Sequence, residues 1–456
     1  MQAIGLILLF LTGFLVIKRI STEFTLTECL GFAFPLGLGL ITFLMMLMDW
    51  IGISLSSTTN LTATMLLLAI AVAINFSRRR SLIRSFKPQW DFKWMNLVWL
   101  LLLVLIVYAE YSNFVKTLYY PTYDRDSMAG FDTIGFVAAQ EHTYKGMSIF
   151  DGSYFPRIHA AGSYITYMPM IQLAYAYVYS LGAETSKAIP ALFYLSFLFG
   201  FYGMTKRATC RTAAILSTFC MMISPEMFSF SSLSNTNVMH ACAASAGIIY
   251  LCLWFKNSER RDLLLGCALL ALNCWIRTEG IVFVVAALLL VLIKVYRTKQ
   301  LRRLLLPAAA LLPIVIFMIY AVTNGLTAES VVIAHPFWDP FKAQAIAGGA
   351  VFLIAVSHYY GYTFLLLLVA AVADIKFAIK ERDGLPALFA IVLTTLLYFL
   401  ILYHINYVWD SLDNVINYSA KRFLFCMVPI AWFYIVTNKM VSNLLQKMEN
   451  ALTFCR

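Results

Sequence analysis

Charge and cysteine pairing are scarce in this chain of 456 residues. Only 12% of the residues are charged, whereas soluble domains carry about 25%. The nine cysteines are scattered along apolar runs, none falls between Tyr111 and Ala188, and no Cys-x-x-Cys pair occurs. These absences argue against a soluble enzyme, a disulfide framework and a cysteine-based metal or redox site.

Hydrophobic residues make up 61% of the sequence, and the mean hydropathy is +0.78. Apolar runs approach the roughly 20 residues that cross a bilayer. They predict an all-α polytopic membrane protein with about 13 transmembrane helices. We expect crossings near 2–17, 29–48, 60–76, 96–112, 188–204, 212–229, 238–255, 262–277, 281–295, 304–322, 361–379, 385–403 and 423–438. The first run lacks a small-residue cleavage site, so we interpret it as a retained span.

The basic residues indicate how the chain is oriented. The net charge of +11 does not predict nucleic-acid binding, because most lysines and arginines form short clusters between apolar runs. Cytoplasmic loops of membrane proteins are enriched in Lys and Arg. With these clusters inside, the N-terminus lies outside, the C-terminus inside, and the polar loop 113–162 on the outer face.

Two apolar segments, Ser163 to Leu181 and Ala343 to Ser357, remain outside this count. If the first crossed, the basic cluster that follows it would move outside, so we expect both segments to be membrane-embedded without crossing. Tyrosines in the first favour the membrane interface. The chain is interpreted as one membrane domain with an N-terminal four-span region (1–112), an outer loop with short helices and an interfacial segment (113–187), and a C-terminal membrane region (188–456).

The unusual polar residues collect on the expected outer face. They are Asp124, Asp126, Asp132, Arg157, His159, Glu226, Arg277, Glu279, Lys421 and Arg422. Ionisable groups at membrane depth cost roughly 2.5–3.5 kcal/mol each, so Arg277 and Glu279 at a hairpin tip favour a functional role. The six histidines show no His-x-x-x-His or His-Glu-x-x-His spacing, so no metal and no cofactor is expected.

Each of these residues also has a structural interpretation. The loop aspartates are equally consistent with solvated loop charges, and Arg277 with Glu279 is consistent with a pair that caps a hairpin. Lys421 and Arg422 are consistent with interfacial anchors before the last span.

Taken in order, these motifs resemble the GT-C superfamily of membrane glycosyltransferases, in particular bacterial relatives of dolichyl-phosphate-mannose protein mannosyltransferases and of aminoarabinose transferases. The resemblance rests on 131–136 (FDTIGF), 154–156 (YFP), 167–169 (YMP), 181–184 (LGAE), 223–226 (ISPE), 275–280 (WIRTEG) and 419–425 (SAKRFLF). The chain departs from the family's pattern by having extra spans before the loop and Phe136 where a Tyr or Trp often follows the acid. Asp124 and Asp126 therefore remain alternatives to Asp132.

The resemblance implies an enzyme that transfers a hexose or pentose from a polyprenyl-phosphate donor to a glycan, lipid, polysaccharide or protein acceptor, with inversion. It implies a carboxylate base, which we assign to Asp132, then Asp126, then Asp124. Arg277, Lys421 and Arg422 would bind the donor phosphate, and Glu279 would orient Arg277. Glu226, Arg157 and His159 are supporting candidates for holding the sugar or the acceptor. The implied place is a bacterial inner membrane, with the site facing the periplasm.

Two other functions compete with this hypothesis. A transporter or flippase for lipid-linked sugars would place charges near the bilayer midplane and carry inverted repeats. A polysaccharide polymerase or O-antigen ligase also has a large outer loop with arginines, but lacks the early aspartate loop and the Arg-x-Glu-Gly hairpin tip.

Overall fold

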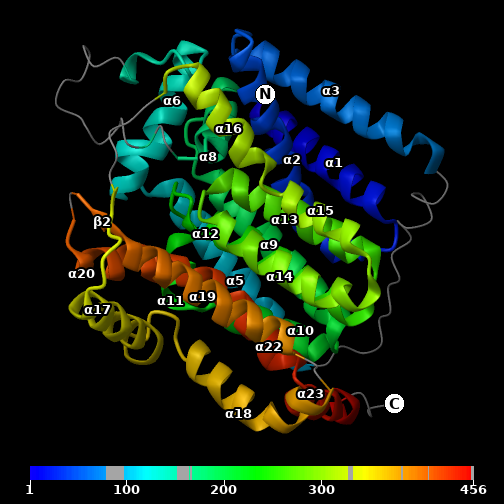
Figure 1. Ribbon diagram of the computed structural model, residues 1–456. Coiled ribbons are helices and arrows are strands. Elements are labelled where there is room, and N and C mark those ends of the chain that lie inside the picture. Colours follow the sequence, from blue (N-terminus) through cyan, green and yellow to red (C-terminus); the bar gives the residue numbers. More distant parts are fainter. Residues whose placement is uncertain are drawn as a thin grey trace.

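A bundle of long helices forms the protein, seen here in a computed structural model (Figure 1). The structure describes residues 1–78, 97–150, 164, 167–326, 332–381, 384–408 and 410–452. The long helices are α1 (Gln2–Ile20), α2 (Leu26–Trp50), α3 (Ser57–Asn75), α5 (Leu97–Tyr119), α9 (Ala188–Ala208), α12 (Asn237–Asn257), α13 (Arg260–Ile276), α14 (Gly280–Thr298), α18 (Thr363–Glu381) and α19 (Leu385–His404). Shorter elements include α6 (Asp132–Glu141), α8 (Met170–Ser180), α10 (Arg211–Met222), α11 (Pro225–Phe230), α15 (Leu305–Ala309), α16 (Leu312–Thr323), α17 (Pro340–Val351), α20 (Leu412–Val415), α21 (Lys421–Phe423), α22 (Met427–Thr437) and α23 (Lys439–Leu452).

The expected membrane-spanning helices are present. Every predicted crossing falls on a helix or a pair of helices. Among the described residues, eight helices are long and apolar enough to cross a membrane, or nine if the bent pair α15 and α16 is one span. The all-α polytopic membrane fold is therefore confirmed, while the figure of about 13 crossings stays a prediction.

Two of the expected spans are interrupted. The predicted span 304–322 is a pair of helices bent by 45°, with Pro313 in the first turn of the second. The predicted span 212–229 consists of α10 and α11, which starts with Pro225. Proline has no backbone N–H and is favoured in the first helical turn, so each new helix begins at or one residue before its proline.

The outer loop contains the short helices that the sequence predicts, with one difference in where they lie. At 11 residues, α8 is about 16 Å long and too short to cross a bilayer. Its tyrosines Tyr175 and Tyr177 are fully buried within the protein, where the sequence predicted an interfacial position for this segment. A two-stranded antiparallel sheet, β1 (Val332–Ala334) with β2 (Ile405–Tyr407), is a small addition to the all-α expectation.

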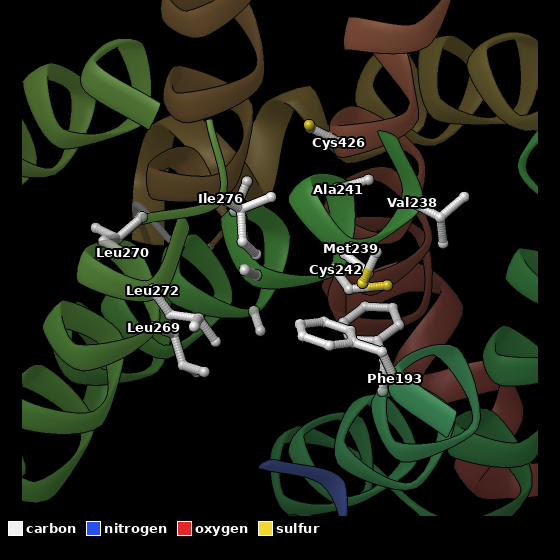
Figure 2. Packing of buried hydrophobic residues seen from close by; sticks show 14 of the residues in the cluster. Phe193, Val238, Met239, Ala241, Cys242, Leu269, Leu270, Leu272, Ile276 and Cys426 are labelled. Atoms are coloured by element: carbon white, nitrogen blue, oxygen red, sulfur yellow. The ribbon is translucent and has the colours of Figure 1, made fainter. Parts of the chain in front are cut away.

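Helix packing is close because small residues face each other. A Cβ atom on Gly13 of α1 would lie 1.8 Å from the carbonyl oxygen of Ala33, and one on Gly37 of α2 would lie 2.0 Å from that of Leu9. Glycines at such crossings let membrane helices approach with their backbones in contact. The most enclosed helix is α12, which is buried throughout from Asn237 to Trp254. Figure 2 shows Met239 and Cys242 of α12 packed near Phe193 of α9.

Ion pairs lie at both ends of the bundle. The helices α6 and α17 and the strand β2 lie at one end, whereas α23 and the C-terminus lie at the other (Figure 1). At the second end Arg207 pairs with Asp262 at 2.7 Å and approaches Glu28 at 3.6 Å, which ties the end of α9 to the starts of α13 and α2. Asp262 lies in the first turn of α13 and Arg277 follows its last residue, so Arg277 lies at the opposite end of α13 from these ion pairs.

Candidate active site

The turn between α13 and α14 carries an arginine. Arg277 ends α13, and a Cβ on Gly280 would lie 2.9 Å from the backbone of Cys274, so the tight turn requires glycine. Glu279 accepts two hydrogen bonds from the guanidinium, from Nη2 at 2.5 Å and from Nε at 3.1 Å. The remaining nitrogen, Nη1, donates to Oδ1 of Asn237 at 2.7 Å. The expectation that Glu279 orients Arg277 is consistent with this two-point contact.

Both members of this pair carry charge. Burial alone would lower the pKa of Arg277, but the carboxylate of Glu279 raises it above its ordinary value. Burial would raise the pKa of Glu279, and the guanidinium of Arg277 holds it below its ordinary value. The pair is therefore ionised at neutral pH, and the side chain of Arg277 keeps 16% of its surface exposed.

A second arginine pairs with an acid of the outer loop. Nη1 of Arg422 lies 2.5 Å from Oδ2 of Asp126, although the two residues are far apart in the sequence. Tyr164 donates its hydroxyl to Oδ1 of Asp126 at 2.9 Å, and Nε of Arg422 donates to the carbonyl of Tyr418 at 3.0 Å. Burial raises the pKa of Asp126, but Arg422, Tyr164 and Arg277 together bring it below its ordinary value.

Tyrosines connect the two ion pairs. The guanidinium of Arg277 lies 6.0 Å from the ring centre of Tyr167, and that ring stacks on Tyr164 with centroids 5.5 Å apart. The charge of Arg277 also lowers the pKa of Asp126. We call Arg277, Glu279, Arg422 and Asp126 the arginine cluster. Sequence separation conceals it, because its members come from the outer loop, the α13–α14 turn and the segment before α22.

Asp132 lies in different surroundings. It is the first residue of α6, and its Oδ1 accepts hydrogen bonds from the hydroxyls of Tyr179 at 2.7 Å and Ser186 at 2.6 Å. Its Oδ2 accepts from Thr122 at 3.3 Å. These three neutral hydroxyls join the start of α6 to α8, to the residues preceding α9 and to the loop that follows α5.

Asp124 closes a local turn. Its Oδ2 accepts from the backbone N–H of Ser127 at 3.1 Å and from the Ser127 hydroxyl at 3.0 Å. This arrangement is an aspartate turn of the kind that starts short helical segments. It positions Asp126, which immediately precedes the helical turn Ser127–Phe131.

Lys421 has partners of its own. Its Nζ lies 3.1 Å from Oε2 of Glu226 and 4.6 Å from the ring centre of Tyr359. Two predicted residues, Lys421 and Glu226, therefore meet, but their contacts are with each other and with Tyr359 rather than with Arg277. Arg157 and His159 lie outside the described residues.

A small cavity with room for about one water molecule lies next to the acids, between the end of α5 and the start of α9. We call it the tyrosine–serine hollow. It is lined by Lys116, Tyr120, Pro121, Thr122, Tyr123, Asp124, Ser127, Lys187, Ser232, Leu233 and Ser234. Most of these side chains are hydroxyl-bearing or charged. Thr122 is hydrogen-bonded to Asp132, and Ser234 is linked to Asp132 through the hydroxyl of Ser186. Asp132 therefore lies directly behind the residues that line the hollow.

Sequence reasoning did not single out several residues that support the site. Asn237, Tyr164, Tyr179 and Ser186 hold its charged groups and were not candidates. Buried Asp49, at the end of α2, accepts hydrogen bonds from Thr143, from the backbone of Tyr144 and Lys145, and from Tyr320. An acid at the end of an apolar run was the available signal for Asp49, since such groups need partners.

Within the described ranges, no group of three or more His, Cys, Asp or Glu side chains is close enough together to hold a metal ion.

Comparison with known proteins gives one match. The family model described as dolichyl-phosphate-mannose-protein mannosyltransferase matches residues 168–322, a region that contains Glu226, Arg277 and Glu279. No curated protein and no solved structure matches the chain. The matched region runs from the start of α8 to the end of α16 and agrees with the resemblance drawn from the motifs. Together with the helical membrane fold, this match over about a third of the chain supports a membrane glycosyltransferase of the GT-C type.

Proposed function

We propose that the protein transfers a sugar from a polyprenyl-phosphate donor to an acceptor hydroxyl, on the periplasmic face of a bacterial inner membrane, with inversion at the anomeric carbon. The arginine cluster is the observation that carries this proposal. Two arginines at the membrane-surface end of the bundle suit the phosphate of a lipid whose tail lies in the bilayer. A hexose or a pentose is compatible with the site.

The arginines would act on the leaving group. When the bond between the anomeric carbon and the phosphate oxygen breaks, negative charge builds up on the phosphate. Fixed cations placed where charge develops lower the barrier. Arg277 is fixed by Glu279 and Asn237, so it is already oriented before a donor arrives.

Among the three loop aspartates, the surroundings favour Asp126 as the base. The base takes the proton of the acceptor hydroxyl while the hydroxyl oxygen attacks the anomeric carbon, and polyprenyl phosphate leaves. Asp126 contacts Arg422 and feels the charge of Arg277, so it lies beside the cations that would hold the phosphate. Asp132 contacts three hydroxyls, and Asp124 is occupied with Ser127.

Donor binding would also activate this base. With no donor present, Arg422 pairs with Asp126 and its charge opposes protonation of the carboxylate. A bound phosphate competes for Arg422, which weakens that effect and raises the pKa of Asp126. A carboxylate whose pKa rises is a stronger base.

The test is release of sugar from polyprenyl-phosphate sugars by purified full-length protein in detergent. The informative variant is Arg277→Gln with Glu279→Gln, because removing both charges avoids leaving one buried and unpaired. We expect the wild type to turn over at least one donor and the double variant to be slower by about 10³-fold. Arg211→Gln, at an exposed arginine of the opposite end, is the matched control and should retain activity.

The rival functions give different results in the same assay. A polymerase or ligase would cleave polyprenyl diphosphate oligosaccharides and leave the monophosphate sugars intact. A transporter would move the lipid-linked sugar between leaflets of a vesicle without cleaving it. Full turnover by the double variant would show that Arg277 does not stabilise the phosphate leaving group.

A further inference from the structure

The C-terminal helix α23 has no part in the proposed transfer reaction. It follows the apolar span that ends with α22 at Thr437, after the single residue Asn438, whose backbone is extended (φ −63°, ψ 151°). Oδ1 of Asn438 accepts a hydrogen bond from the backbone N–H of Val441 at 2.9 Å. The new helix therefore begins where a membrane-spanning helix ends, at the end of the bundle that carries the C-terminus (Figure 1).

One side of α23 is docked on the bundle. Val441 packs against the core, Leu445 is only 6% exposed, and Oε2 of Glu449 accepts a hydrogen bond from the backbone N–H of Thr212 in α10 at 3.1 Å. Residues four apart lie on the same side of a helix. These three residues therefore define the docked side, and their contacts fix the position of α23.

A second side of α23 is apolar but uncovered. Met440, Leu444 and Met448 are 56%, 60% and 45% exposed. They are also four residues apart, and each directly precedes a docked residue, so this stripe is rotated by about 100° from the docked side. Single exposed apolar residues are common on proteins, whereas an aligned row of them indicates a contact surface. We call these three residues the apolar stripe.

Polar residues occupy the rest of the helix. Asn443, Gln446, Lys447 and Asn450 are exposed. With 14 residues, α23 is about 21 Å long, so it is both too short and too polar to cross a bilayer. A helix with an apolar stripe beside a polar, lysine-bearing side is typical of helices that lie in the plane of a membrane surface.

The bundle end that carries α23 is basic. Among the described residues of this end, α9 and α12 finish with Lys206, Arg207 and Lys256 in their last turns, and α10 starts with Arg211. The acids Glu28 and Asp262 are buried beside Arg207, and Glu23 and Glu259 pair with Arg261. Anionic lipid headgroups attract basic residues at a membrane surface. Charge and the apolar stripe therefore favour the same contact surface.

We infer that α23 lies in the headgroup region of the leaflet opposite the arginine cluster and binds anionic phospholipids. The apolar stripe contacts the acyl chains, and Lys447, which is one residue from Met448, extends to the lipid phosphates. A bilayer surface is the occupant that the structure favours, because α22 delivers α23 to that surface. This inference does not depend on which reaction the protein catalyses.

The test is hydrogen–deuterium exchange of the full-length protein in nanodiscs that hold one copy each. One set of nanodiscs contains phosphatidylcholine alone, and the other also contains about 30% phosphatidylglycerol. We expect the backbone amides of α23 to exchange about fivefold or more slowly in the anionic nanodiscs, because headgroup contacts oppose local opening of the helix.

Matched variants place glutamine on different sides of α23. Lys447→Gln should remove most of the difference between the two lipid mixtures. Leu444→Gln with Met448→Gln should speed exchange about tenfold in both mixtures, because the apolar stripe loses its contact with lipid. Asn443→Gln, on the polar side, is the control and should exchange as the wild type does. The amides of buried α12 should be unchanged in every variant, which shows that the bundle remains folded.

Three results would overturn the inference. Equal exchange in the two lipid mixtures would exclude recognition of anionic lipids. Equal exchange in the wild type and in the variant of Leu444 and Met448 would mean that the apolar stripe does not contact lipid. Slow exchange that appears only in nanodiscs with two copies would assign the apolar stripe to a contact between copies of the chain.

Discussion

Asp126 and Asp132 belong to the same stretch of outer loop, yet their partners are of opposite kinds. Asp126 contacts a guanidinium and a tyrosine hydroxyl, and its pKa is lowered by that cation. Asp132 contacts three neutral hydroxyls, two of them from residues outside the loop segment. The comparison teaches that residue type and position in a loop do not assign a role, because the partners set what a carboxylate can do.

The same contrast extends to the charges around the two acids. Asp126 lies beside guanidinium groups that suit a phosphate, whereas the side chains that contact Asp132 are hydroxyls. On our proposal, the surroundings of Asp126 serve the leaving group.

The largest expected effect is the loss of kcat when the proposed base, Asp126, is substituted. Asp126→Asn removes the proton acceptor, so kcat should fall by about 10²–10⁴-fold. Asp132→Asn changes a carboxylate that contacts neutral hydroxyls, so kcat should fall by less than about tenfold. Steady-state kinetics with separately varied donor and acceptor measures both quantities.

The opposite pattern would reassign the base. A loss of kcat in Asp132→Asn, with near-normal kcat in Asp126→Asn, would return the role to Asp132, the residue that the family resemblance placed first. Thermal unfolding of both variants serves as the control, since either change alters a hydrogen-bonded group.

A smaller effect is expected within the pair Lys421 and Arg422. Arg422→Lys keeps the charge but loses the planar fork that binds phosphate at two points, so the KM for the donor should rise about tenfold. Lys421→Met should change that KM by less than about threefold, because Lys421 pairs with Glu226 and Tyr359. A larger effect of Lys421→Met would place Lys421 in the donor site, as the sequence-based assignment did.

The helical membrane fold was accessible from the sequence because its main signal is local. Long apolar runs predicted where the helices lie, and eight or nine of the described helices are long and apolar enough to cross a membrane. Arg277 and Glu279 were also accessible as a pair, since residues two apart in a tight turn between helices present their side chains together. Breaks such as the one before Pro225 were not predicted, although the prolines were visible.

The partners of the remaining site residues were not accessible, because they depend on tertiary packing. Nothing in the sequence near Arg422 indicates that it contacts Asp126, because most of the predicted spans lie between the two residues in the sequence. Nor does the neighbourhood of Lys421 indicate Glu226. The tyrosines of α8 show the same limit: composition suggested a membrane interface, but Tyr175 and Tyr177 are enclosed by neighbouring helices. Periodicity reports that a face is apolar or aromatic, not which neighbour covers it.

The smallest expected effect concerns the stability that the Asp126–Arg422 pair supplies, and it depends on pH. The pKa of Asp126 in the folded protein is below its ordinary value, so the unfolded chain binds a proton at a higher pH than the folded chain does. The pair therefore stabilises the fold above about pH 4, and this contribution is lost as the pH falls through the lowered pKa.

Asp126→Asn and Arg422→Gln should each destabilise the protein by on the order of 1 kcal/mol at neutral pH and by less in acid. The double variant should be no less stable than either single one, because the two changes remove one interaction. Thermal unfolding in detergent between about pH 7 and pH 3 measures these differences. If the destabilisation is the same at all pH values, the ion pair does not contribute and the substitutions act through packing. That result is expected for substitution of Asp132, which contacts neutral hydroxyls, and not for substitution of Asp126.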